Sequence, residues 1–340
     1  MPYTTATQVF FAHNQKPTLG VTGSKGKSTT ASLISHLLKK TGIKAELLGN
    51  IGCPMLETFL KNPSKTELYV LELSSYQLDE LSASPDLAVV TNLFPEHMTH
   101  HGGIEPYYEA KKNLIRHQNA AAVFMVNTAH PLIRKWTQET PARAVPFSTW
   151  IPKKTPLLGE HNRSNLAAAL AATQQARQWL HKKPCTQAQL QKALQSFAPL
   201  PHRLQKVGTF KGITFYDDAI STSPESTIEA IKALSPLAPI GTLFLGGEDR
   251  GYDFTELEKV LRRYKIPKLI LLPDTGKRIL KSKKGFQTFE ANSLEEAVAL
   301  AFKHTPRGTL CVLSTASPHA FGMSFEDRGN KFQNLIRKNE

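Results

Sequence analysis

Residues 20–30 read GVTGSKGKSTT and join an apolar run to a helical pattern. Gly26, Lys27 and Ser28 have the spacing that ends a phosphate-binding loop, G-x-x-x-x-G-K-[ST], but the first glycine of that pattern would fall at Val21. A glycine-rich turn lets backbone N–H groups approach phosphate oxygens, and the following helix adds its positive N-terminal dipole. We expect Lys27 to reach the β- and γ-phosphates and Ser28 to hold Mg²⁺. An ordinary turn before a helix is the alternative, but the order of strand, loop and amphipathic helix favours nucleotide binding.

The composition is that of a globular protein with a basic surface. The chain has 340 residues, of which 40% are hydrophobic and 21% charged. Its net charge of +14 would suit a nucleic-acid partner, but no nucleic-acid-binding motif accompanies the basic clusters, so a site for anionic small molecules is favoured. We expect no membrane partner, because no apolar run approaches the roughly 18 residues of a membrane helix. Three cysteines without metal-ligand spacing and the lack of a signal peptide predict a cytoplasmic protein: Cys53, Cys185 and Cys311.

The pattern of apolar runs predicts an α/β fold in two domains. We expect a nucleotide-binding P-loop domain with a mostly parallel sheet over 16–199, followed by a Rossmann-like α/β C-terminal domain over 200–340. Apolar strands alternate with helical patterns in both, and the proline-rich APLPHR at 198–203 is expected to link them. In the second domain, Pro224 suits the first turn of a helix and Ser293 suits an N-cap.

Three residues beyond the loop are candidates for metal binding. Glu72 ends the apolar run LYVLELSS, and a carboxylate at a strand end beside a phosphate-binding loop is a natural Mg²⁺ ligand, although many strands end in Glu. His97 follows another strand in NLFPEHMTHHGG, where a lone histidine is more often structural. Lys111 lies in the helical pattern YYEAKKNLI, and a solvated helix face is the alternative.

Ten short motifs occur in an order that resembles the Mur ligases of peptidoglycan synthesis, most closely the glutamate-adding MurD branch. The resemblance runs from about residue 5 to the end of the chain. The loop of that family reads T-G-[TS]-x-G-K-[ST], with its first glycine at Gly23, which accounts for Val21. The motifs are TGSKGKST, GNIGCP, LELSSYQL, NLFPEHMTHHG, YYEAK, GEHNRSN, PHR, DD before STSP, LGGEDRGYDF and SFEDRGNKF.

The resemblance implies an ATP-dependent amide-bond ligase. ATP would phosphorylate the carboxylate of UDP-N-acetylmuramoyl-L-alanine, and the amine of glutamate would attack the acyl phosphate. Two Mg²⁺ ions would neutralise the transferring phosphoryl group, and Lys111 matches a lysine that the family carbamylates into a metal ligand. Domain closure would assemble the site. The implied catalytic residues are Lys27, Glu72, His97, Lys111 and Arg203; the implied metal ligands are Ser28, Glu72, His97 and Lys111. The implied nucleotide contacts are Gly23, Ser24, Lys25, Gly26, Lys27, Ser28, Thr29, Asn162, Asn165, Arg203 (γ-phosphate) and Asp218 (ribose); the implied substrate contacts are Asn50, Arg250 and Phe325.

Departures from the family pattern fall in the expected amino-acid pocket. Ile220 stands where the MurD branch has a lysine, and Arg250 stands where a lysine is usual. The segment STASPHAF replaces S-P-A-C-A-S, and Phe325 is the best match to a phenylalanine that lines the pocket. D-glutamate is the favoured substrate. An L-glutamate-adding Mur ligase is the alternative, and the segment DDAIST at 217–222 is somewhat more typical of that branch.

Residues 1–15 resemble the tail of the UDP-binding domain that precedes the phosphate-binding loop in this family, and we expect the rest of that N-terminal domain to be missing, as in a fragment or the product of a truncated gene. We therefore expect this chain, as a monomer, to bind ATP but to hold the UDP-sugar weakly, and micromolar binding would contradict this. Two other functions remain open. A folylpolyglutamate synthase-like ligase shares the chemistry, although GNIG and LELSSYQL fit the MurD branch better, and a non-catalytic nucleotide-binding module is possible from the sequence.

Overall fold

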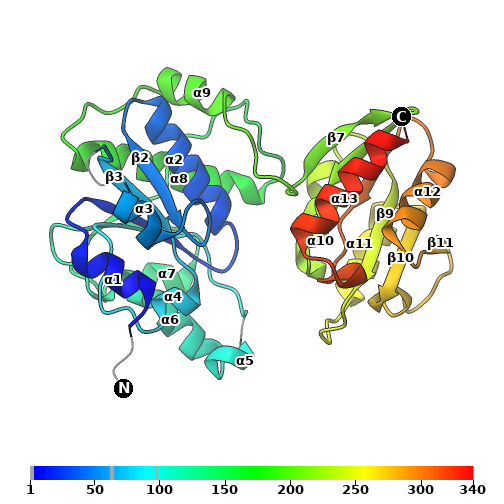
Figure 1. Ribbon diagram of the computed structural model, residues 1–340, viewed down its shortest axis with the longest axis horizontal. Coiled ribbons are helices and arrows are strands. Elements are labelled where there is room, and N and C mark those ends of the chain that lie inside the picture. The colour runs from blue at the N-terminus through cyan, green and yellow to red at the C-terminus, as the bar shows by residue number, and fades with distance from the viewer. Residues whose placement is uncertain (1–3, 62–64, 97, 340) are drawn as a thin grey trace. The chain divides into compact units, whose positions relative to one another are not determined.

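The computed structural model describes residues 4–61, 65–96 and 98–339 (Figure 1). The chain divides into two compact units. The first unit comprises Met1–Pro156 and His161–Ala198, and the second unit comprises Leu157–Glu160 and Pro199–Glu340. The two are described separately below.

Within the described residues, the first unit has a six-stranded, fully parallel sheet with the strand order β2-β3-β1-β4-β5-β6. Strands β1, β3 and β4 are buried along their whole length, as expected for apolar runs in a sheet with both faces covered. Strand β1 lies between β3 and β4, so the loops after these three strands meet at one edge. The strands are β1 (Thr18–Thr22), β2 (Ala45–Gly49), β3 (Leu68–Glu72), β4 (Leu87–Val90), β5 (Val123–Val126) and β6 (Arg143–Pro146).

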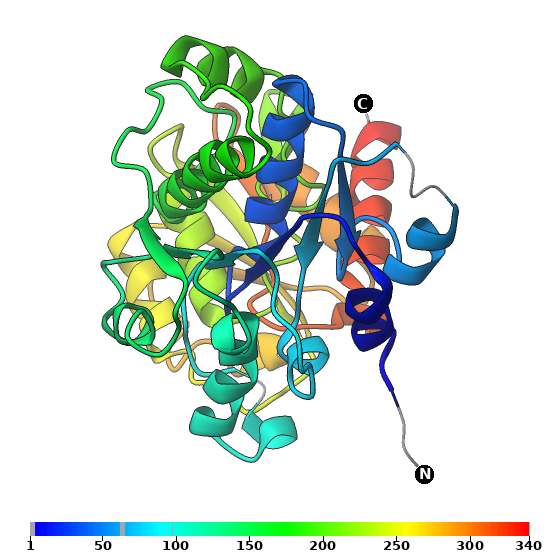
Figure 2. The same cartoon turned by 90° about the vertical axis from the view of Figure 1, so that its left-hand side faces the viewer.

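Helix α2 (Lys27–Lys40) follows the phosphate-binding loop and is buried on every side over residues 29–35, so the amphipathic helix predicted from the sequence is wrong for this stretch. Leu33, Leu37 and Leu38 are fully buried, and the helix ends just before Gly42, whose φ of +86° suits the left-handed turn after a helix. It packs beside α8 (His161–Trp179), which is rich in buried alanines (Figure 2). The remaining helices of this unit are α1 (Ala6–His13), α3 (Met55–Lys61), α4 (Ser75–Leu78), α5 (Met98–His101), α6 (Ile104–Arg116), α7 (Pro131–Trp136) and α9 (Gln187–Gln195).

The second unit contains another six-stranded sheet in the part of the chain that the structure describes, with the order β11-β10-β9-β12-β8-β7. All neighbours are parallel except β7 and β8, which form an antiparallel pair. The strands are β7 (Gln205–Phe210), β8 (Ile213–Asp217), β9 (Ile240–Gly247), β10 (Lys268–Asp274), β11 (Gln287–Glu290) and β12 (Leu310–Leu313). The helices are α10 (Pro224–Leu234), α11 (Thr255–Arg263), α12 (Leu294–His304) and α13 (Phe325–Lys338), with 3₁₀ turns η1 (Thr275–Lys277) and η2 (Ala320–Gly322).

The two mostly parallel sheets confirm the predicted α/β class. Pro224 lies in the first turn of α10, and the Ser293 side chain caps α12 by accepting the backbone N–H of Glu296, as the sequence predicts. Among the described residues, the helices are all too short or too polar to cross a bilayer.

Candidate nucleotide and metal site

The glycine-rich loop 23–26 joins β1 to α2 at the carboxyl edge of the first sheet. Parallel strands deliver their following loops to the same edge, where ligands bind in open α/β sheets. Glu72 is the last residue of β3, and Thr91 and Asn92 follow β4, so three neighbouring strands supply side chains to this place. Two surface hollows lie at the opposite edge instead, near the starts of β1 and β5, away from the loop.

Two glycines allow the loop to take its path. Gly23 has a φ of +143°, and a Cβ there would lie 2.0 Å from Thr91 Oγ1. Gly26 has a φ of +81°, and its Cβ would lie 2.3 Å from Asn165 Oδ1. Both positions therefore require glycine, for its backbone conformation and for space. The first glycine that the loop needs is therefore Gly23, whereas position 21 is a valine in the preceding strand. This agrees with the spacing T-G-[TS]-x-G-K-[ST].

Side chains from the segment after β4 and from α6 hold the loop in place. The Asn92 side chain accepts the Lys25 N–H at 2.8 Å and donates to the Lys25 carbonyl at 3.0 Å. The Ser24 hydroxyl accepts hydrogen bonds from the Phe94 N–H at 2.8 Å and from the Tyr107 hydroxyl at 3.0 Å. Burial raises the pKa of Tyr107, so it stays a protonated donor. The loop is thus largely preorganised for a ligand.

Two lysines reach the same part of the loop. Lys27 Nζ donates to the carbonyls of Gly23 and Ser24 at 3.0 and 2.9 Å, and Lys111 Nζ donates to the Gly23 carbonyl at 3.0 Å. Lys111 is 1% exposed, which excludes the solvated helix face considered from the sequence. Burial, and then the charge of Lys27, lower the pKa of Lys111 from 10.5 to about 7, although Glu96 and Glu72 oppose the shift. A substantial fraction of Lys111 is therefore a neutral amine at physiological pH.

Glu72 is fully buried beside the start of α2. Its Oε1 accepts hydrogen bonds from the Ser28 hydroxyl at 3.2 Å and from the Asn50 amide at 3.3 Å. Its Oε2 is also buried and has no hydrogen-bond partner among the described residues. Since a buried carboxylate oxygen without a partner is costly, this atom fits a position for a bound cation. The sequence placed Ser28 and Glu72 together as metal ligands, and the structure brings them into contact.

The first turn of α8 closes another side of the loop. The Asn165 amide donates to Asn162 Oδ1 at 2.9 Å, and Asn165 is buried against Gly26. Thr29, in the first turn of α2, is buried as well. The two asparagines predicted as nucleotide contacts are therefore neighbours of the loop. His97 lies outside the described residues.

The remaining predicted residues belong to the second unit. Asp218 is 3% exposed and accepts hydrogen bonds from the Leu204 N–H at 3.1 Å and the Ser314 hydroxyl at 2.9 Å; burial raises its pKa to about 7. Arg203 is half-buried in the turn before β7. Arg250 is exposed and pairs with Glu248 at 3.1 Å, and Phe325, at the start of α13, is partly buried with its ring 6.3 Å from that of His202.

Two residues that hold the loop, Tyr107 and Asn92, are not predicted from the sequence. Tyr107 lies in the YYEAK motif but its link to Ser24 depends on the packing of α6 over the loop. Asn92 lies in the TNL segment after β4, and a polar residue directly after a buried parallel strand was the available signal.

Taken together, the loop, the buried carboxylate and the two lysines define a P-loop nucleotide-binding domain of an α/β protein with a second α/β unit. The Mur ligase middle domain matches residues 21–155, and the Mur ligase glutamate ligase domain matches residues 202–317. A UDP-N-acetylmuramoyl-L-alanine--L-glutamate ligase of Salinispora tropica is 38% identical over 99% of this chain and 78% of its own. The chain belongs to the Mur ligase family, and it is an ATP-dependent ligase.

Two further similarities agree with this membership. A UDP-N-acetylmuramoylalanine--D-glutamate ligase of Acetivibrio thermocellus is 32% identical over 99% of this chain and 78% of its own. The crystal structure of the MurF ligase of Thermotoga maritima with ADP covers 98% of this chain and 83% of its own with a TM-score of 0.75 at 19% identity, which shows the shared fold.

Proposed function

We propose that this chain joins glutamate to UDP-N-acetylmuramoyl-L-alanine at the expense of ATP, in the synthesis of peptidoglycan precursors. The observation that carries the proposal is the buried Glu72 beside a preorganised P-loop, in a chain whose curated relatives bear the name of this ligase. ATP would transfer its γ-phosphoryl group to the alanine carboxylate. The amine of glutamate would then attack the acyl carbon, form the amide bond and release phosphate. Such a ligase works where ATP is made, in the cytoplasm, and we propose that it acts as a monomer.

The residues of the first unit have distinct roles in this proposal. Lys27 and the backbone N–H groups of 23–28 hold the phosphates of ATP, and Thr29, Asn162 and Asn165 support that end of the nucleotide. Glu72 and Ser28 would hold Mg²⁺, because Glu72 Oε2 is a buried acceptor without a partner in the described structure. When bound, the ion neutralises charge on the transferring phosphoryl group. Asn50 donates to Glu72 and thereby orients its carboxylate.

Lys111 is suited to carbamylation. Its Nζ must be a neutral amine to attack carbon dioxide, and burial lowers its pKa to about 7. The nitrogen lone pair would form a C–N bond to the carbon of CO₂, one C=O π pair would move to oxygen, and the nitrogen would lose a proton to water. The product is an anionic carbamate in place of a cation, which would serve with His97 as a ligand of a second Mg²⁺. We extend the proposal to Arg203 for the γ-phosphate, Asp218 for the ribose, and Arg250 and Phe325 for the substrate.

The proposed amino acid is L-glutamate. The sequence motifs favour D-glutamate, and relatives of both specificities match the chain, but the two with 38% and 36% identity bear the L-glutamate name. Ile220 supports this choice, because the D-glutamate pattern of the MurD branch has a lysine at that position. Since isoleucine carries no charge, a carboxylate of the amino acid must be bound by other groups in this chain.

The experiment measures phosphate release by the purified chain with ATP, Mg²⁺ and a high concentration of UDP-N-acetylmuramoyl-L-alanine. We expect release that requires glutamate, is faster with the L than with the D enantiomer, and is abolished in Glu72→Gln. Faster release with D-glutamate would overturn the enantiomer. Release with a reduced folate in place of the UDP-sugar, or ATP binding without release under any of these conditions, would overturn the function.

A further inference from the structure

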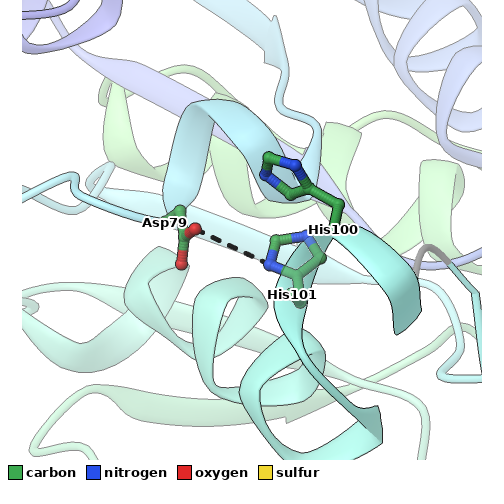
Figure 3. A group of neighbouring side chains, drawn as sticks. All are labelled: Asp79, His100 and His101. Atoms are coloured by element: carbon green, nitrogen blue, oxygen red, sulfur yellow. Dashed lines mark ion pairs between the residues drawn. The ribbon is translucent and has the colours of Figure 1, made fainter.

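Two histidines and one aspartate form a cluster that the proposed ligase chemistry does not use. Asp79 directly follows α4, and His100 and His101 end the short helix α5 (Figure 3). Both imidazole rings extend from α5 toward the segment that carries Asp79. One ligand atom from each of the three residues lies within 4.8 Å of the others. Two segments of the first unit thus bring three metal-binding groups to one place.

One distance in the cluster is close to the spacing of two ligands of the same metal ion. His101 Nδ1 and Asp79 Oδ2 are 3.6 Å apart, which is too long for a hydrogen bond. Two ligands that each lie about 2.0 to 2.1 Å from a tetrahedral Zn²⁺ ion are separated by about 3.4 Å. This pair is therefore close to the spacing that an ion between them would impose. His100 is exposed and can complete the set by rotating its side chain.

The surroundings of His101 prepare Nδ1 for an ion. Its Nε2 lies 3.0 Å from the Ser75 hydroxyl, so that an Nε2–H can donate to Ser75 while the Nδ1 lone pair faces Asp79. A partner of this kind on the second ring nitrogen is typical of metal-bound histidines. Burial lowers the pKa of His101, which favours the neutral ring that binds metals, even though Asp79 opposes the shift.

We propose that Asp79, His100 and His101 bind one Zn²⁺ ion that joins the end of α4 to the end of α5. Two imidazoles with one carboxylate select Zn²⁺ over Mg²⁺, which prefers oxygen ligands, and the exposed side of the cluster leaves the fourth position to water. The ion would stiffen a segment next to the nucleotide loop, since the His101 ring lies 5.5 Å from that of Tyr107, and Tyr107 holds Ser24. The ordinary alternative is an aromatic cluster, because the His100 and Tyr76 rings are 4.3 Å apart.

Calorimetric titration of the chelator-treated chain with ZnCl₂ tests the proposal. We expect wild type to bind one Zn²⁺ ion. The affinity of His100→Gln and of Asp79→Asn for Zn²⁺ should be lower by about 10- to 100-fold or more. His117→Gln is the matched control, since His117 is an exposed histidine at the end of α6 in the same unit, and it should bind as wild type does. Equal affinity in wild type and His100→Gln, or no binding by wild type, would overturn the site.

A second measurement keeps binding apart from folding. Hydrogen–deuterium exchange of residues 99–103 should slow when ZnCl₂ is added to wild type and to His117→Gln, but not when it is added to His100→Gln. Each protein is compared with its own zinc-free state, so loss of the ring contact between His100 and Tyr76 does not enter the comparison. Slowing of the same size in all three proteins would place the ion elsewhere and refute the proposal.

Discussion

Lys111→Met tests the most unusual group of the site, a lysine that is buried against another cation. Burial and the charge of Lys27 lower its pKa from 10.5 to about 7, so the folded chain releases a proton that the unfolded chain keeps up to about pH 10. Between these two values the unfolded state binds more protons. The free energy of unfolding must therefore rise with pH through this window, which is the signature of a lysine whose pKa is lowered by folding.

The magnitude follows from the two pKa values. A difference of one bound proton changes the free energy of unfolding by about 1.4 kcal/mol per pH unit. Lys111 is about half deprotonated in the folded chain at pH 7 and almost wholly so at pH 9. Wild type should thus gain about 2 kcal/mol from this residue between about pH 7 and pH 9. Methionine has a similar volume and no charge, so Lys111→Met should lack this gain.

Urea unfolding measured by tryptophan fluorescence is the assay. All three tryptophans, Trp136, Trp150 and Trp179, belong to the first unit, so the signal reports the unit that contains Lys111. Buffers must be free of CO₂, because a carbamate would replace the titrating amine. Lys112→Met is the matched control: Lys112 pairs with Glu109 and Glu139, its pKa is raised, and it stays charged throughout this window.

We expect the free energy of unfolding of Lys111→Met, minus that of wild type, to fall by about 2 kcal/mol from about pH 7 to pH 9. The corresponding difference for Lys112→Met should stay constant. A stronger hydrogen bond from the ammonium form of Lys111 to the Gly23 carbonyl would reduce this slope and cannot produce it. A pH-independent difference for Lys111→Met would refute the lowered pKa and, with it, the readiness of this amine for CO₂.

Three more predictions concern other parts of the chain. Glu72→Gln should lower glutamate-dependent phosphate release by about 10²-fold or more, because it removes the negative charge at Oε2. Since glutamine keeps the side-chain volume, the urea midpoint should barely change; near-normal release would contradict the role of this oxygen. Gly26→Ala should lower the free energy of unfolding of the first unit by about 1 to 3 kcal/mol and weaken ATP binding in a titration. Gly42 has a similar φ, but no described atom lies within 4 Å of its Cβ position, so Gly42→Ala should lower the free energy of unfolding by less; equal losses would mean that the clash with Asn165 is relieved. Folding raises the pKa of Asp218 from 3.8 to about 7, so the free energy of unfolding of the second unit should fall as the pH rises from about 4 to 7. Asp218→Asn should make this free energy, measured from the protection of the β8 amides against hydrogen exchange, depend less on pH.

Local pattern was enough to predict the nucleotide loop, because its residues are consecutive in the chain. The order of strand, glycine turn and helix predicted Lys27 and Ser28, and the structure places both at the start of α2. Glu72 required one further step, since it comes from a strand far along the sequence. The position of Glu72 at the end of an apolar strand supplied that step, and Glu72 indeed lies beside Ser28.

Contacts that depend on packing could not be predicted in this way. The hydrogen bond from Tyr107 to Ser24 depends on where α6 packs against the sheet, and no spacing in the sequence encodes it. The burial of Lys111 could not be predicted either. The next residue, Lys112, is also a lysine, but it forms ion pairs with Glu109 and Glu139, and nothing in the local sequence tells the two lysines apart. Motif resemblance suggested a role for Lys111, whereas only its surroundings give the physical reason.

Those surroundings also separate two uses of the same lysine. A triphosphate near Lys111 would stabilise the ammonium form, raise the pKa of Lys111 and draw a proton from solvent. Carbamylation has the opposite sign, because the neutral amine reacts and a proton is released. Glu72 Oε2, which has no hydrogen-bond partner in the described part of the chain, favours a nearby cation, and an ammonium at Lys111 would repel one. If the site holds both polyphosphate and divalent cations, as we propose, a lysine whose charge can be inverted serves it better than a fixed cation, and a pKa near the ambient pH makes that inversion accessible.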